Sequence, residues 1–146
     1  MSDSRRQDII DKLDTTLKAI TSFAGHVYGW KLDPTDLIIN NQLPCICYRD
    51  TGEDISPSSI CPSHGKQKHD LKMEFLILAQ GTDADKTVRE LLKLFYAAIG
   101  ADQTLAGLCD WAKDISDEMQ VEQEAKTDAA CLVKMTFEYQ TASFTY

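Results

Sequence analysis

The sequence lacks a hydrophobic run long enough to cross a membrane. A membrane-spanning helix needs about 18 consecutive apolar residues, and no stretch of this chain approaches that length. The segment after Met1 is polar and charged and is not followed by the apolar core of a secretory signal. We therefore expect a cytosolic product with no membrane partner.

Positive charge is also scarce. The 146 residues include 15 Lys and Arg against 23 Asp and Glu, a formal net charge of −8. Wrapping DNA or lying on an anionic bilayer requires clustered positive charge, so both roles are disfavoured. Glycine and proline are few, at 7 and 4, and 43% of the residues are hydrophobic. This composition predicts one globular domain over residues 1–146.

A convincing metal site is missing as well. Cys45, Cys47, Cys61 and His64 could supply four zinc ligands, but ligand pairs usually come from tight turns. Cys45 and Cys47 instead lie in a predicted strand, where they share one face and resemble small buried hydrophobes. The five cysteines are an odd number without a secretory signal, which favours free thiols. We expect no disulfide, no metal and no cofactor.

No catalytic motif stands out. A cysteine could pair with His26, His64 or His69, yet no glycine-rich elbow surrounds any cysteine. The acidic residues between 114 and 124 alternate with apolar ones, as on a solvated strand face. We expect a protein that is not an enzyme. A small metal- or thiol-dependent enzyme using Cys61 and His64 remains the alternative.

The strongest pattern that is present runs from His69 to Gly100 and predicts a strand followed by a helix. Thr82 or Asp83 is expected to cap the helix with a side-chain oxygen, and Gly100 to end it. The strand alternates with period two and the helix carries one apolar stripe. The apolar residues are Leu71, Met73, Phe75, Ile77 and Ala79 in the strand and Val88, Leu91, Leu92, Phe95 and Ile99 in the helix.

The rest of the chain adds one helix and several strands. Ser4 and Gln7 have capping-box spacing before a predicted helix over 5–21. Short strands are expected near 27–30 and 43–48, and a long antiparallel hairpin over 115–122 and 131–139, in whose first strand Ile115, Met119 and Val121 alternate with polar residues. This order predicts an α+β fold with a mostly antiparallel sheet of about four to five strands and two main helices packed on one face.

The segment from Arg49 to Lys68 has no apolar period and contains glycine, proline and four serines. A loop of this length inside a domain is usually functional or disordered, so we expect a mobile loop that orders on assembly. Its charged residues are the candidate assembly residues: Arg49, Asp50, Glu53, Asp54, Lys66 and Lys68.

Four short sequence patches, in their order along the chain, resemble those of a known family. The strand Leu43-Pro44-Cys45-Ile46-Cys47-Tyr48 is similar to a Leu-Pro-x-Ile-x-Val strand, and Ile77-Leu78-Ala79-Gln80-Gly81 is similar to a strand ending in glycine. Asp102-Gln103-Thr104-Leu105-Ala106-Gly107-Leu108 and the aromatic strand at 137–141 complete the set. Together they resemble the tail terminator (tail completion) proteins of long-tailed bacteriophages, a family of minor tail proteins. The cysteine content and the 61–69 segment depart from the family pattern.

The resemblance implies a structural role without catalytic residues. Such proteins are similar in fold to tail-tube subunits and form a ring, commonly a hexamer, on the last ring of the tube. The ring stops polymerisation and contacts both the major tail protein and the head connector, and DNA passes through its lumen without specific binding. The expected location is the virion tail, and the host cytoplasm during assembly. Another head–tail connector or adaptor protein is the alternative reading.

Overall fold

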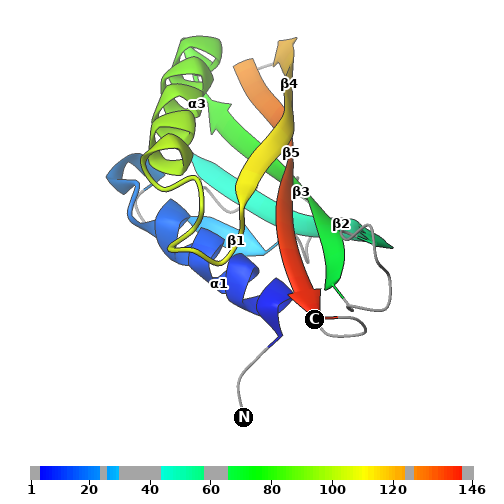
Figure 1. Ribbon diagram of the computed structural model, residues 1–146. Coiled ribbons are helices and arrows are strands. Elements are labelled where there is room, and N and C mark those ends of the chain that lie inside the picture. Colours follow the sequence, from blue (N-terminus) through cyan, green and yellow to red (C-terminus); the bar gives the residue numbers. More distant parts are fainter. Residues whose placement is uncertain (1–3, 24–25, 30–43, 58–65, 124–126, 143–146) are drawn as a thin grey trace.

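The computed structural model describes residues 4–23, 26–29, 44–57, 66–123 and 127–142 (Figure 1). The helical elements are α1 (Arg5–Lys18), the 3-10 turn η1 (Thr21–Phe23) and α3 (Ala84–Ala101). The strands are β1 (Val27–Gly29), β2 (Cys45–Pro57), β3 (Lys66–Gln80), β4 (Trp111–Gln123) and β5 (Thr127–Ala142).

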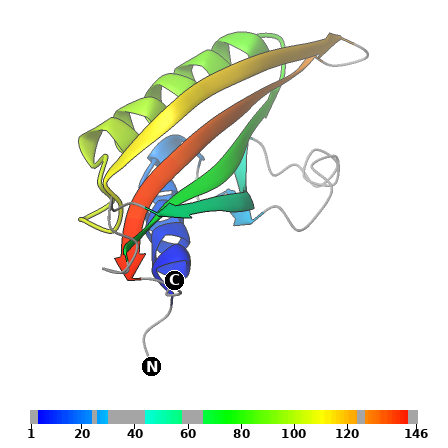
Figure 2. The same ribbon diagram turned by 45° about the vertical axis from the view of Figure 1, so that its right-hand side comes forward.

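The strands form a five-stranded sheet in the order β1-β2-β3-β5-β4. β1 pairs with β2 in parallel, and the other three pairings are antiparallel. Helices α1 and α3 lie on the same face of the curved sheet (Figure 2). The predicted α+β fold, with a mostly antiparallel sheet and two helices on one face, is confirmed.

The two helices begin differently. Ser4 Oγ accepts a hydrogen bond from the Gln7 backbone N–H at 3.1 Å, as predicted, but the Gln7 side chain donates to Asp11, so the capping box is half made. For α3 the prediction of a side-chain cap is wrong, because Asp83 occupies the N-cap position without a capping side-chain bond. The turn at Gly81 instead satisfies the Ala84 N–H with a backbone carbonyl.

The main core lies between the helices and one sheet face. The alternate residues of β3 and β5 and the apolar stripes of both helices are buried together, as their periodicity predicts. Burial of each large side chain contributes about 1.5–3 kcal/mol. The stripe residues fully buried at this interface are Ile9, Leu13, Leu17, Val88, Phe95, Leu71, Phe75, Ile77, Val133 and Phe137.

The predicted loop over 49–68 is wrong at both ends. Residues 49–57 belong to β2 and residues 66–68 to β3. The two strands pair with each other here, and β5 pairs with the other side of β3. The side chains there are matched by charge and not by hydrophobicity, which removes the apolar alternation that normally identifies a strand. Only 58–65, which include Cys61 and His64, lie outside the described residues in this region.

The start of β4 also differs from the prediction. The strand begins at Trp111, and a bulge between Lys113 and Ser116 interrupts its pairing with β5. Asp114, inside this bulge, has a positive φ of 52°. A bulge inserts an extra residue and interrupts the regular alternation of faces, and Ile115, which lies inside it, is 50% exposed although its alternation with polar residues grouped it with Met119 and Val121.

Candidate functional site

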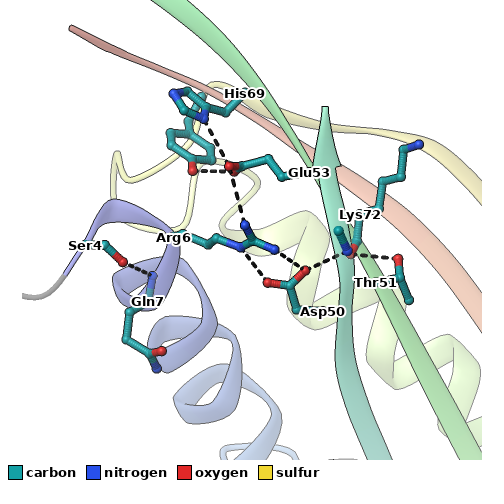
Figure 3. Close-up of polar contacts among 10 residues, drawn as sticks. Ser4, Arg6, Gln7, Asp50, Thr51, Glu53, His69 and Lys72 are labelled. Carbon is teal, nitrogen blue, oxygen red and sulfur yellow. Dashed lines mark hydrogen bonds and ion pairs between the residues drawn. The ribbon is translucent and has the colours of Figure 1, made fainter. Parts of the chain in front are cut away.

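A buried polar network lies where the first turn of α1 meets β2, β3 and β5 (Figure 3). The side chains of Glu53 and His69 are only 2% and 1% exposed. Glu53 accepts a hydrogen bond from the Tyr139 hydroxyl, and its carboxylate lies 3.1 Å from His69 Nδ1. On the other side of the ring, His69 Nε2 lies 2.7 Å from Thr141 Oγ1. The network thus joins three strands through one carboxylate.

Arg6 connects this network to the helix. Its guanidinium donates two hydrogen bonds to Asp50, at 2.6 and 2.8 Å, and Nη1 lies 3.7 Å from Glu53. Two acidic residues three apart in a regular strand would point to opposite faces. A bulge between Asp50 and Gly52 inserts one residue, so Asp50 and Glu53 both face α1. The bulge therefore positions both carboxylates for Arg6.

The series Glu53, His69 and Thr141 has the carboxylate–imidazole–hydroxyl order of a hydrolytic triad. His69, however, is only 1% exposed and is stacked on Tyr139 with ring centroids 4.6 Å apart. A substrate carbonyl would have no path to the imidazole, so we interpret the network as a connection between α1 and the sheet. Sequence reasoning missed this connection, because its members are far apart in the chain and none lies in a motif.

Acid is expected to weaken the Arg6–Asp50 connection. Burial alone would raise the pKa of Asp50, but hydrogen bonds from Arg6 and from the Gly52 N–H outweigh it and lower the pKa. A lowered folded-state pKa means that the stabilisation is complete above the unfolded-state pKa, about 3.9, and is lost as pH falls through the folded-state value. Urea unfolding between pH 7 and 3 measures the effect. At pH 7 the free energy of unfolding of wild type should be well above that of Asp50→Asn, and the difference should shrink below about pH 4. A difference that stays constant to pH 3 would contradict this account.

The opposite sheet face has no helix over it among the described residues, and charged side chains occupy one half of it. Asp70 and Glu138 are direct cross-strand neighbours, an arrangement that is repulsive unless neutralised. Lys68 and Lys113 lie between them, with Lys113 Nζ 2.9 Å from Asp70 and 3.5 Å from Glu138. This ladder holds β3, β5 and β4 together by charge at the end of the sheet where the apolar pattern is absent.

The candidate assembly residues are therefore divided between two faces. Arg49, Asp54 and Lys68 lie on the helix-free face, where Arg49 pairs with Glu74 at 2.6 Å and Asp54 with Lys72 at 2.9 Å. Asp50 and Glu53 face α1 and belong to the buried network. Lys66 begins β3. None of these residues lies on the loop that the sequence predicted.

The cysteine pair lies at the other end of the helix-free face. Cys45 and Cys47 are both buried in a small cluster with Leu78, which confirms that they share a face. A hydrogen bond with Cys47, together with burial, raises the pKa of the Cys45 thiol and keeps it protonated. In the described part of the chain no three His, Cys, Asp or Glu side chains are arranged to hold a metal. Cys61 and His64 lie outside that part, so the absence of bound metal remains a prediction.

An open groove of about 350 Å³ occupies the middle of the helix-free face, between the bulges of β2 and β4. Its lining mixes both signs of charge with hydroxyl groups. The sequence did not predict this groove, because the two bulges beside it follow from strand pairing and not from a local sequence pattern. The lining residues are Thr51, Lys72, Met73, Glu74, Asp114, Lys134, Met135 and Thr136.

Comparison with known proteins assigns no family to the chain: no protein-family model matches it, and no curated protein matches it either. Neither helix in the described residues is long and apolar enough to span a bilayer.

Proposed function

We propose that this protein is a tail terminator of a long-tailed bacteriophage, which caps the tail tube as a ring and ends its polymerisation. The four sequence patches described above support the proposal through their order along the chain. The fold that the resemblance implied, a mostly antiparallel sheet with helices on one face, agrees with the observed one. The single observation that carries an assembly role is the pair of open sheet edges.

Both edges of the sheet that the described strands form can accept another strand. β4 has a neighbour on one side only, and β1 covers the outer side of β2 only opposite 46–48, so residues 49–57 form a second open edge among the described strands. Long open edges favour pairing with another chain. Exposed apolar side chains lie on both edge strands. They are Ile55 on β2 and Trp111 and Ile115 on β4.

The strand directions suit a ring. Three successive antiparallel pairings lead from β2 to β4, so the two edge strands run in opposite directions. When copies of equal orientation stand side by side, β4 of one copy meets β2 of the next as an antiparallel pair. Such a contact is heterologous, and it generates a ring if the rotation closes. The net charge of −8 keeps the free subunits apart until the tail tube provides a template.

A second assembly role, that of another head–tail connector or adaptor, would use the same edges. Gene order separates the two, because a terminator gene is expected just before the gene of the major tail protein. Stoichiometric zinc, or one cysteine that is rapidly labelled at neutral pH, would instead favour the metal- or thiol-dependent enzyme.

Loss of the protein should leave phage tails of uncontrolled length while heads remain normal. Complementation of a phage lacking the gene, followed by electron microscopy of tail lengths, tests this. Wild type should restore uniform tails, whereas Ile115→Asp should not, because a charge at the open edge of β4 opposes strand pairing. The matched control is Leu94→Asp on α3, which is similarly exposed at 41% but lies on a helix and not on an edge strand, and should complement. Normal tails joined to heads without the protein would disprove the proposal.

A further inference from the structure

Two charged side chains on the β2 edge share one face of the sheet although they are five residues apart. In a regular strand such residues point to opposite faces. Arg49 and Asp54 nevertheless both lie on the helix-free face, because the bulge of β2 lies between them. Their cross-strand partners, Glu74 and Asp70, are accordingly only four residues apart on β3. The β2 edge therefore carries a positive charge followed by a negative one on this face.

The β4 edge repeats this pattern. Lys113 and Glu118 are also five residues apart, and the bulge of β4 lies between them. Their partners on β5, Thr136 and Leu132, are four residues apart, so both charged side chains lie on the helix-free face. The β4 edge thus carries the same sequence of signs, with the same spacing and the same interruption.

Antiparallel pairing of two such strands brings each positive residue opposite a negative one. When β4 of one copy lies beside β2 of the next, Glu118 faces Arg49. In the same register Lys113 faces Asp54. The two bulges then fall side by side, so each face of the sheet continues across the contact. A slip of two residues would separate both charge pairs and both bulges.

The strand β1 limits this contact at one end. It occupies the outer side of β2 beside residues 46–48, so a neighbouring strand can pair with β2 only from Arg49 onwards. The pair of Arg49 with Glu118 lies at that limit. At the other end Trp111, the first residue of β4, lies opposite Ser56. This register therefore uses nearly the whole open edge of β2.

Trp111 is a half-exposed side chain that is already held in place. Its indole N–H donates to the Glu138 carboxylate, and Lys113 Nζ lies 5.8 Å from the ring centroid. A tryptophan that is held before association loses little freedom on binding, and tryptophan is a common anchor of protein interfaces. The exposed residue opposite it, Ser56, is small and leaves room for the indole ring.

We propose that copies of this chain join edge to edge in this single register, with β4 of one copy on β2 of the next. Arg49 and Asp54 already have partners within the chain, but their side chains are 48% and 70% exposed and can accept a second partner. The occupant of the open β2 edge is thus a second copy. The inference rests on the proposed ring for its biological role, whereas the contact itself can be measured on the purified protein.

Sedimentation equilibrium of the full chain tests the register. Millimolar protein is used, because the net charge of −8 opposes association in dilute solution. Glu118→Arg should weaken association about tenfold, since it places two positive charges opposite each other. By net charge alone the same change would strengthen association, so a loss is specific to the contact. The matched control Glu90→Arg, at an exposed position of α3, should not weaken association.

A second charge reversal should restore what the first removes. Arg49→Glu alone should also weaken association, and the double variant with Glu118→Arg should return to within about threefold of wild type. Residues 49 and 118 lie on opposite edges, with β3 and β5 between them, so recovery reports a contact between copies. Arg89→Glu on α3, which likewise loses an ion pair within the chain, is the control for the single change.

Failure of this register and failure of the terminator function give different results. A wild-type chain that stays monomeric at millimolar concentration would overturn the register, and so would a double variant that associates no better than the single ones. Association that follows the charge pairs supports the register even if a phage lacking the gene builds normal tails. In that case the contact would stand and only the terminator function would be lost.

Discussion

Phe75→Asp is expected to eliminate soluble folded protein. Phe75 lies in the middle of β3, is fully buried, and packs against Phe95 of α3 with ring centroids 5.0 Å apart. The substitution removes this contact and buries a carboxylate without a partner, which costs several kcal/mol from a total stability of about 5–15 kcal/mol. The soluble fraction after expression and the thermal unfolding curve of any soluble product measure the effect.

Ile115→Asp is the matched control for Phe75→Asp. It makes the same kind of change on another strand, at a position that is half exposed. Its carboxylate remains hydrated, so the protein should stay soluble and unfold near the wild-type temperature. Soluble Phe75→Asp protein with wild-type unfolding would show that the core has been placed on the wrong face of β3.

Glu53→Ala is expected to give the second largest loss of stability, about 3–5 kcal/mol. Removing this carboxylate leaves the Tyr139 hydroxyl and His69 Nδ1 without their buried acceptor and leaves Arg6 facing a cavity. Urea unfolding at neutral pH measures the loss. Glu53→Gln, which keeps one carbonyl oxygen but no charge, should fall between alanine and wild type.

The neighbouring residue provides the control for Glu53→Ala. Asp54 pairs with Lys72 on the opposite face, where both side chains are exposed, so Asp54→Ala should change stability little. Equal losses in Glu53→Ala and Asp54→Ala would mean that the buried network contributes no more than a surface ion pair. That outcome would remove the assigned role of Glu53 in holding α1 on the sheet.

The elements that sequence reasoning predicted well are those in which hydrophobicity and local geometry agree. The helices near α1 and α3, the second half of β3 and residues 131–139 of β5 each carry one apolar face, and that face alone specifies period, orientation and burial. Phe75 and Phe137 could be assigned to the core without knowledge of their neighbours. Sequence reasoning also placed Cys45 and Cys47 on one face correctly, because strand periodicity is a local property.

The incorrect predictions share a different cause. The charged half of β2 depends on partners that are distant in sequence, such as Glu74 for Arg49, and an isolated charged segment resembles a loop. The exposure of Ile115 depends on a bulge whose position is decided by the pairing of β4 with β5. Neither property can be read from a hydrophobic pattern, because neither is produced by hydrophobicity.

The sequence by itself therefore determined the fold class, the two helices and the apolar face of the sheet, since these follow from local periodicity and from the need to bury one side of each element. Only the tertiary structure decided which polar residues meet. Arg6, Glu53, His69 and Tyr139 come from four different elements, and a one-residue bulge turns Glu53 towards the helix. The open edges and the groove likewise exist only after the strands have paired, because strand order and register create them.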